Sequence, residues 1–287
     1  MPVPELEYLR PHSLSDALTL LQQYGDRAKI LAGGQTLIPA LTMGLSRPEV
    51  LIDIGGIAAL RYIECQGDEL VLGALARHRD VEHSAIVKER CPLLAAAAAL
   101  IGHSHVRNRG TIGGSIAHAD PAAEYPVALL ALEAVVELAG PTGTQAVPAQ
   151  RFFLGPLTTA ARPDQLVTAV RIPALDPKVG WDFRELVMRS GDFALVCVGV
   201  LVGLEGRRVI GAAIAVGGVG PTATRLRDTE AALVGRLASS RTWQVAGEAA
   251  AGEIAATGDV SATADYRRAT TAVYVEEALS SAASRIR

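Results

Sequence analysis

The sequence predicts an α+β fold of three consecutive units, which we place at 1–56, 57–175 and 176–287. The chain has 287 residues, more than most single domains. Its composition, 49% hydrophobic and 20% charged, is typical of a compact globular protein. In the last unit, strand-like runs come first and helix-like runs follow, an order typical of an α+β domain. We therefore expect a three-stranded sheet plus helices in that C-terminal domain.

The first unit is predicted to run strand, helix, strand, short helix, strand. A helix over 13–25 has a serine at its start, apolar residues at helical spacing and Gly25 as its stop. The apolar run "AKILAGG" predicts a strand that breaks on glycine. "TLIPALTMGL" predicts a short helix, with Pro39 near its first turn, where proline is tolerated. "EVLIDIGG" predicts the last strand.

The second unit is predicted to mix strands and helices. "RYIECQGDELVLGA" predicts a hairpin that turns at Gly67 and Asp68. An alanine-rich buried helix is expected in "ERCPLLAAAAALIG", ending at Gly102, and a polar, glycine-bearing loop is expected at 103–120. A helix in "EYPVALLALE" and strands in "AVVELAG" and "DQLVTAVRIPALDP" complete the unit.

In the third unit, apolar runs predict strands at 181–188, 194–204 and 208–217. Helices are expected in "DTEAALVGRLAS", "RTWQVAGEAAAGEIAAT" and "DYRRATTAVYVEEALSSAASRI". The most hydrophobic window of the chain, 193–220, falls on the second and third strands. Because charged residues at 205, 207 and 208 interrupt it, we expect two buried strands there and no membrane span.

The charge balance disfavours two classes of partner. The formal net charge is −3 and the pI is about 6.1, so neither nucleic acid nor an anionic membrane is expected as the main partner. The opening stretch, "MPVPELEYLRPHSL", has no basic segment followed by a long apolar one. We therefore expect no secretion signal, and a cytoplasmic protein.

The metal-binding side chains are sparse. Cys65, Cys91 and Cys197 have no CxxC spacing, so reduced cysteines are expected and no iron–sulfur cluster held by this chain alone. His103 and His105 could face one side of an extended segment as a metal pair, but no third ligand stands close in sequence. No metal site is expected.

Two stretches about eighty residues apart share a pattern: "ILAGGQT" at 30–36 and "RGTIGGSIAHAD" at 109–120. Each runs from apolar residues into a glycine pair and then into small polar side chains. Adjacent glycines permit positive φ and close approach of the backbone, so N–H groups can point at an anion, and a helix that starts just afterwards adds its positive end. Taken by themselves, the residues predict either a phosphate-binding surface or two tight turns.

A Rossmann dinucleotide site is an alternative interpretation of the first stretch. Asp53 ends a predicted strand twenty residues after Gly33, where a ribose-binding acid would stand. However, "AGGQTLIPAL" lacks the GxGxxG spacing, and Pro39 stands where a long phosphate-binding helix should run. The sequence therefore disfavours this alternative.

Two longer stretches carry a family resemblance. "KILAGGQTLIPALTMGLSRPEVLIDIGGI" and "VRNRGTIGGSIAHADPAAEYPVALLAL" resemble the two FAD-binding segments of the molybdenum hydroxylase flavoproteins. The chain is similar over essentially its whole length to the medium subunit of bacterial carbon monoxide dehydrogenases, and to the FAD unit of xanthine dehydrogenases. The resemblance includes a C-terminal domain entered through "FRELVMRSGDFALV". It implies a two-subdomain FAD-binding fold of the vanillyl-alcohol-oxidase/PCMH type, followed by that domain.

The resemblance also implies the binding residues, with FAD as the cofactor and no catalytic or metal-ligating side chain. In the family, two segments wrap the FAD pyrophosphate through backbone amides. The first segment here is Leu31, Ala32, Gly33, Gly34, Gln35, Thr36 and Leu37, and the second is Thr111, Ile112, Gly113, Gly114 and Ser115. The resemblance further implies Ile101 on the adenine side, Asp120 and Glu124 at the sugar region, and Arg184 and Phe193 beside the flavin.

These residues also have ordinary structural interpretations. The threonines and Ser115 could cap helices or form turns, and Glu124 could be a solvated carboxylate at a helix start. Ile101 and Phe193 could be plain core, and Arg184 could be an exposed partner in an ion pair.

The resemblance implies an oxidoreductase subunit that transfers electrons. In the family, substrate is oxidised at a molybdenum–pterin centre in a large subunit, and electrons pass through two [2Fe–2S] clusters of a small subunit to FAD. The partners implied are therefore a large molybdopterin-binding and a small [2Fe–2S] subunit, in an L–M–S assembly that is commonly doubled. NAD⁺, a quinone or another carrier would be the terminal acceptor.

Two other functions compete with this one. A self-sufficient flavin-dependent oxidase of the vanillyl-alcohol-oxidase type shares the general FAD fold, but those chains are usually much longer and add a substrate-capping domain. A non-catalytic ligand-binding module would carry no flavin.

Overall fold

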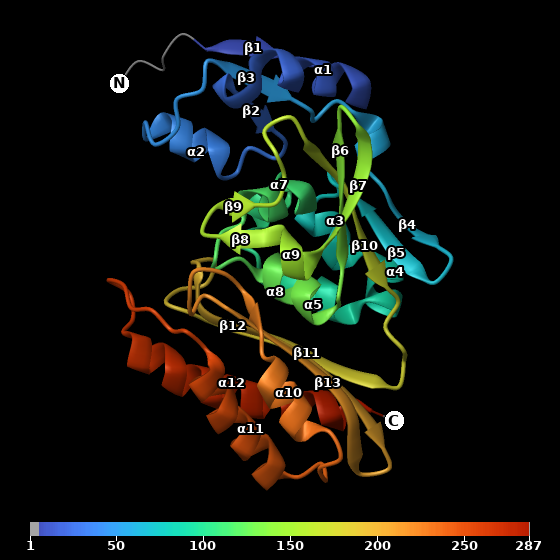
Figure 1. The fold of residues 1–287 in the computed structure, drawn as a ribbon, viewed down its shortest axis with the longest axis vertical. Coiled ribbons are helices and arrows are strands. Elements are labelled where there is room, and N and C mark those ends of the chain that lie inside the picture. Colours follow the sequence, from blue (N-terminus) through green and yellow to red (C-terminus); the bar gives the residue numbers. More distant parts are fainter. Residues whose placement is uncertain (1–5, 287) are drawn as a thin grey trace.

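The computed structural model describes residues 6–286, which stack as three tiers along the longest axis of the molecule (Figure 1). Each tier contains a sheet, and the predicted α+β class is confirmed. Residues 1–5, which belong to the stretch expected to lack a secretion signal, and residue 287 lie outside the described range.

The upper tier has the predicted order of strand, helix, strand, short helix, strand. Its three strands form a parallel sheet in the order β1-β3-β2. Ser13 caps the first helix by accepting a hydrogen bond from the amide of Asp16 (3.1 Å), and Ala17 and Leu21 are its buried residues. The elements are β1 (Glu7–Leu9), α1 (Leu14–Tyr24), β2 (Ala28–Leu31), α2 (Leu37–Thr42) and β3 (Val50–Asp53), with 3₁₀ turns at Gly25–Arg27 and Ala58–Leu60.

The middle tier is built around a five-stranded antiparallel sheet in the order β4-β5-β10-β6-β7. The predicted hairpin of β4 and β5 turns at Gly67, whose φ of 61° suits glycine. The strands are β4 (Ile63–Gln66), β5 (Glu69–Gly73), β6 (Val135–Gly140), β7 (Gly143–Pro148) and β10 (Leu166–Pro173). The remaining elements are α3 (His78–His83), α4 (Ala85–Arg90), α5 (Pro92–Leu100), α6 (Ser104–Arg107), α7 (Ile112–His118), α8 (Glu124–Ala131) and α9 (Ala149–Phe152), and the ribbon β8 (Phe153–Gly155) and β9 (Thr158–Thr159).

The middle tier departs from the prediction in several places, and α3, α9 and the β8–β9 ribbon were not predicted at all. The helix expected in "ERCPLLAAAAALIG" is broken at Cys91, because Pro92 lacks an amide hydrogen and begins a new helix, α5. The loop expected at 103–120 contains α6 and α7, and the glycine pair lies in the first turn of α7. Strand β7, "GTQAVP", was missed because it is mostly exposed and has no apolar alternation.

The lower tier has the three expected strands and one short addition. The sheet order is β11-β12-β13-β14, and β14 has only two residues, too few to give a sequence pattern. Three helices follow, as predicted. The elements are β11 (Val179–Val187), β12 (Ala194–Glu205), β13 (Arg208–Gly217), β14 (Thr224–Arg225), α10 (Arg227–Leu233), α11 (Ser240–Glu253) and α12 (Ala264–Ser284).

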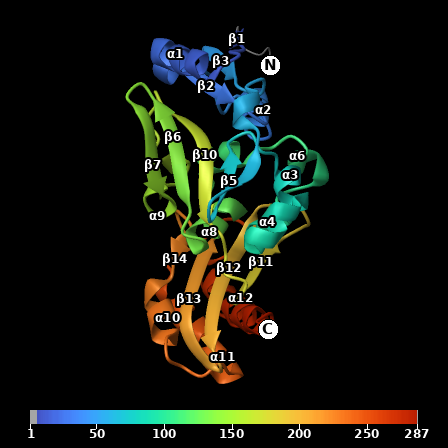
Figure 2. The same ribbon diagram turned by 90° about the vertical axis from the view of Figure 1, so that its right-hand side faces the viewer.

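The lower sheet is buried on both faces, which explains its nearly continuous hydrophobic sequence. Valines at even positions of β12 pack toward α11 and α12, while Cys197 and Gly199 face the middle tier. Helix α8 lies between the middle and lower sheets (Figures 1 and 2). It comes close because Gly217 leaves room: a Cβ there would lie 2.6 Å from Cγ2 of Val127. Within residues 6–286, none of the helices has the length and apolar composition needed to cross a membrane.

Candidate functional site

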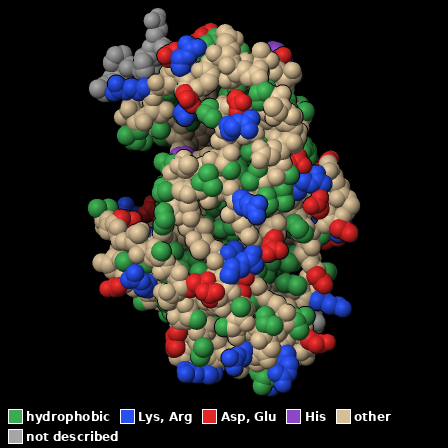
Figure 3. Space-filling model, viewed as in Figure 1, with side chains coloured by type: hydrophobic (Ala, Val, Ile, Leu, Met, Phe, Trp, Pro, Cys, Tyr) green, Lys and Arg blue, Asp and Glu red, His purple; other side chains and the backbone are tan. Residues whose placement is uncertain are grey.

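The two glycine segments meet in space, at the junction of the upper and middle tiers. The first follows β2, and the second leads into α7. A Cβ placed on Gly33 would lie 2.7 Å from Cα of Gly110, and closer still to the carbonyl oxygen of Arg109. The surface is hollowed between the upper tier and the elements below it, on the left-hand side of Figure 3. The backbones therefore touch at a position that only glycine permits.

The first segment presents unused backbone donors. Among the described residues, no protein acceptor bonds the N–H groups of Gly33, Gly34, Gln35 and Thr36. Gly34 has a φ of 72°, which turns the chain before α2 begins. Gly33, Gly34 and Gln35 are half-buried and Thr36 is exposed. Consecutive backbone amides without protein acceptors are suited to binding an anion.

The second segment differs, because its amides are already bonded inside the protein. Two of these hydrogen bonds join the start of α7 to the residues that directly follow β5, and the other two cap the N-terminus of α7. Those amides therefore already have acceptors within the protein, and their bonds fix the position of α7. That this segment wraps a phosphate, as the resemblance implied, stays a prediction. The bonds run from Ile112 to the carbonyl of Ala76 (3.0 Å), from Gly113 to that of Ala74 (2.9 Å), from Gly114 to Oγ1 of Thr111 (3.2 Å) and from Ser115 to the carbonyl of Thr111 (3.0 Å).

The glycines of the second segment have separate roles. Gly113 is buried, and a Cβ on it would lie 2.5 Å from Cβ of Ala74 and 2.7 Å from its carbonyl oxygen. It is therefore required for packing α7 against the end of β5. Gly114 faces the first segment, since its Cβ would lie 3.9 Å from Cβ of Ala32.

Glu124 begins α8 and is only 7% exposed. Burial, with the nearby charges of Glu185 and Asp120, raises the pKa of the Glu124 carboxyl to about 8. Asp120 accepts a hydrogen bond from the amide of Ala122 (2.9 Å) at the turn that precedes α8. The structure thus places both implied acids between α7 and α8, with Glu124 held mainly in its neutral form near neutral pH.

Glu185 is a half-buried acid that the sequence analysis missed. It pairs with Cys197 across the lower sheet, its Oε2 atom is buried without a hydrogen-bond partner, and burial raises its pKa to about 7. Strand alternation was the signal that could have found it, since Glu185 shares a face with Phe183, which packs toward α8.

Arg184 points the opposite way along the same strand. Its guanidinium pairs with Asp182 (2.8 Å) and with Glu277 of α12. The structure therefore brings Glu185, and not Arg184, toward Glu124.

At pH values above about 7, replacing Glu124 with glutamine is expected to raise the melting temperature of the apoprotein. A carboxyl that titrates near pH 8 when folded and near 4.5 when unfolded stabilises the fold fully below about pH 4.5. That contribution is lost as the pH rises to about 8, by on the order of a few kcal/mol. Thermal melts from pH 5 to 9 would measure the difference.

The matched control for that experiment is Glu89→Gln, because the Glu89 side chain is 76% exposed. It should leave the pH dependence of the melting temperature unchanged. Parallel curves for wild type and Glu124→Gln over the whole range would contradict the buried, neutral carboxyl.

The remaining residues that the resemblance implies for FAD binding lie in different parts of the fold. Leu31 and Leu37 are half-buried on either side of the first glycine pair. Ile101 is buried in the core of the middle tier, and its carbonyl accepts a hydrogen bond from Arg107 (3.2 Å). Phe193 precedes β12 and is 67% exposed, so its ring is free to pack against another group.

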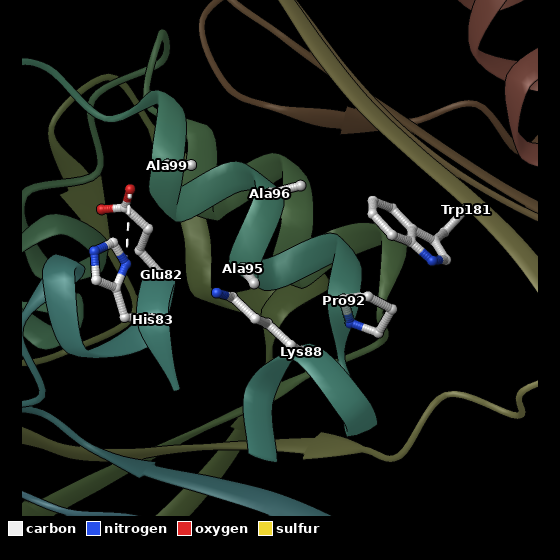
Figure 4. Close-up of a pocket in the computed structure, with 8 residues that line it drawn as sticks. All are labelled: Glu82, His83, Lys88, Pro92, Ala95, Ala96, Ala99 and Trp181. Carbon is white, nitrogen blue, oxygen red and sulfur yellow. Dashed lines mark ion pairs between the residues drawn. The ribbon is translucent and has the colours of Figure 1, made fainter. Parts of the chain in front are cut away.

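Two clefts lie elsewhere. One, of about 440 Å³, opens between α3, α4, α5 and the ring of Trp181 (Figure 4). Another, of about 230 Å³, lies beside it. The residues that line these two clefts do not belong to the glycine segments. The candidate site is therefore identified by the backbone geometry of the glycine segments and not by a cleft. Within residues 6–286, no three His, Cys, Asp or Glu side chains gather closely enough to hold a metal, although the rings of His103 and His105 lie 5.7 Å apart.

Comparison with known proteins agrees with this geometry. The family described as the FAD binding domain in molybdopterin dehydrogenase matches residues 4–175, and the CO dehydrogenase flavoprotein C-terminal domain matches 181–282. The carbon monoxide dehydrogenase medium chain of Hydrogenophaga pseudoflava is 39% identical over 282 residues, 98% of each chain. The nicotine 6-hydroxylase medium subunit of Paenarthrobacter nicotinovorans is 38% identical over 93% of each. A solved structure of the Hydrogenophaga pseudoflava enzyme superposes with a TM-score of 0.97 at 40% identity, covering 100% of both chains.

Proposed function

The chain belongs to the FAD-binding family of the molybdopterin dehydrogenases, and from that premise we propose that it is the electron-transferring medium subunit of a molybdenum hydroxylase. The observation that carries the proposal is the row of four open amides at Gly33–Thr36, held against the second glycine segment. When bound there, FAD would accept electrons from a partner's iron–sulfur clusters and pass them to a terminal acceptor.

The residues present fit this cofactor. The open amides of the first segment would hold the pyrophosphate, with the hydroxyls of Thr36 and Ser115 as further donors. The second segment would form the opposite wall. Asp120 and Glu124 would meet the sugar region; a neutral Glu124 would be able to donate as well as accept a hydrogen bond.

Two residues are proposed at the flavin end. Phe193, exposed at the start of β12, would cover an apolar ring face. Arg184 would have to break its ion pairs with Asp182 and Glu277 to reach a cofactor bound at the junction of the upper and middle tiers. Phe193 is therefore the better supported of the two.

Partners are required for the whole reaction. The similar proteins are named as medium chains and medium subunits of larger enzymes. We propose a large molybdopterin-binding subunit and a small [2Fe–2S] subunit, assembled as an L–M–S unit that is doubled. The cysteines support this division, because Cys65 is exposed while Cys91 and Cys197 are buried in the core, where they cannot serve an exposed cluster.

We also propose the division of the chain at 1–56, 57–175 and 176–287. Each part has its own sheet and hydrophobic cluster. The clusters interlock at the junctions, since Leu75 and Leu166 pack into the upper core and Phe183 packs into the middle one.

One non-covalently bound FAD per chain is the expected cofactor content. The purified protein would be denatured and passed through a desalting column, and the flavin in the small-molecule fraction identified. FAD should leave the polypeptide, because the proposed site would hold it by hydrogen bonds from backbone amides and by packing. Colour that stays with the chain, or FMN in the filtrate, would contradict the proposal. Apoprotein should be reconstituted with FAD before loss during purification is taken as absence.

A further inference from the structure

His78 lies against Gly110, the residue that directly precedes the second glycine segment. It is the first residue of α3 and is 4% exposed. Its amide donates a hydrogen bond to the carbonyl of Gly110 (3.1 Å). Its ring fills the space that a side chain on residue 110 would occupy. A Cβ on Gly110 would lie 2.5 Å from Nε2 and 2.6 Å from Cδ2 of the ring. The imidazole thus packs directly against Gly110.

Tyr125 holds this ring in place from the other side. Its hydroxyl lies 3.2 Å from Nδ1 of His78, and the two ring centroids are 5.3 Å apart. Tyr125 is fully buried on α8, which is itself packed against the glycines of the lower sheet. The imidazole therefore has little freedom to tilt away from Gly110.

Gly110 also touches the first glycine segment, because its Cα is one of the backbone atoms that a Cβ on Gly33 would strike. Tyr125, His78, Gly110 and Gly33 therefore form one continuous line of contacts, from α8 to the open amides. Moving the imidazole would move the second segment relative to the first.

We propose that His78, held by Tyr125, is a positioning residue that sets the separation of the two glycine segments and hence the affinity for FAD. This inference rests on the proposed function as a FAD-binding subunit. His78 acts through its shape and hydrogen bonds and not through charge. Burial, together with the charge of Arg107, lowers its pKa to about 4, so the imidazole is neutral at physiological pH.

The test compares three variants of the full chain: His78→Ala, Tyr125→Phe and, as a matched control, Phe152→Leu. Phe152 is fully buried in the hydrophobic cluster that also contains Tyr125, and its ring packs against Phe153. FAD affinity would be measured from the quenching of flavin fluorescence on titration of apoprotein, and stability from thermal melts without FAD. His78→Ala should weaken FAD binding roughly tenfold or more, and Tyr125→Phe about fivefold, beyond any change in the control.

A readout without FAD makes the outcome decisive. Amide hydrogen exchange across 110–115 in the apoprotein should be faster in His78→Ala and Tyr125→Phe than in the control. His78→Asn, which keeps a polar atom near the tyrosine hydroxyl, should restore part of the FAD affinity. Equal losses of affinity and stability in all three variants, with unchanged exchange in the segment, would overturn the proposal. Failure of the wild-type apoprotein to bind FAD would instead refute the proposed function, while the exchange data still decide the role of His78.

Discussion

Replacing Gly33 with valine is expected to abolish FAD binding, lowering the affinity by at least about a hundredfold. The added Cβ would lie 2.7 Å from Cα of Gly110 and nearer still to the carbonyl oxygen of Arg109. Both obstacles are backbone atoms, which cannot rotate aside as a flexible side chain could. The two glycine segments must therefore separate, and the open amides of Gly33–Thr36 would lose the opposite wall of the proposed cofactor site.

The matched control is Gly211→Val. Gly211 lies in β13, and a Cβ there would meet no atom within 4 Å, so the same substitution should be tolerated in a strand. Flavin absorbance per chain would be measured for both variants after reconstitution, with circular dichroism to confirm folding. A folded Gly33→Val protein with the flavin content of wild type would contradict the site.

Gly113→Val does not provide the same test. Its Cβ would strike Ala74 at the end of β5, so the substitution disturbs the packing of α7 and reports on folding before it reports on the cofactor.

The isolated chain is expected to carry out no substrate oxidation, and to accept electrons from substrate only when combined with its partner subunits. Within the two glycine segments, 31–37 and 111–115, no side chain is a strong acid or base. The two carboxyls whose pKa is raised are Glu124, which is buried, and Glu185, which is half-buried, and neither belongs to the glycine segments. The chain is thus built to hold a cofactor and to pass electrons.

This expectation is tested by anaerobic reduction of the bound flavin, followed through its absorbance. Adding the substrate of the assembled enzyme should leave the flavin of the lone subunit oxidised, and should bleach it rapidly in the complex. Dithionite, a chemical reductant, is the control that shows the flavin in the lone subunit to be reducible. Rapid bleaching by substrate without partners would favour a self-sufficient flavin oxidase instead.

Local sequence patterns predicted the elements whose signals are contained within them. Helix α1 was predicted because its serine cap, apolar spacing and terminal glycine all lie within 13–25. The β4–β5 hairpin was predicted for the same reason, since Gly67 supplies the positive φ of its turn. The break at Cys91 was missed, although Pro92 indicates the start of a new helix, because the alanine run that follows suggested one continuous helix.

The sequence by itself determined that two glycine pairs follow apolar runs, and hence that two backbone surfaces could approach a ligand. The tertiary structure alone decided what each surface does. The amides of Gly33–Thr36 are open, while those of 112–115 are bonded to residues that include the distant Ala74 and Ala76. It also decided that Glu185 faces α8, and that His78 supports Gly110. The physical reason is that burial and hydrogen-bond partners depend on which distant segments pack together, and that information is not contained in any local pattern.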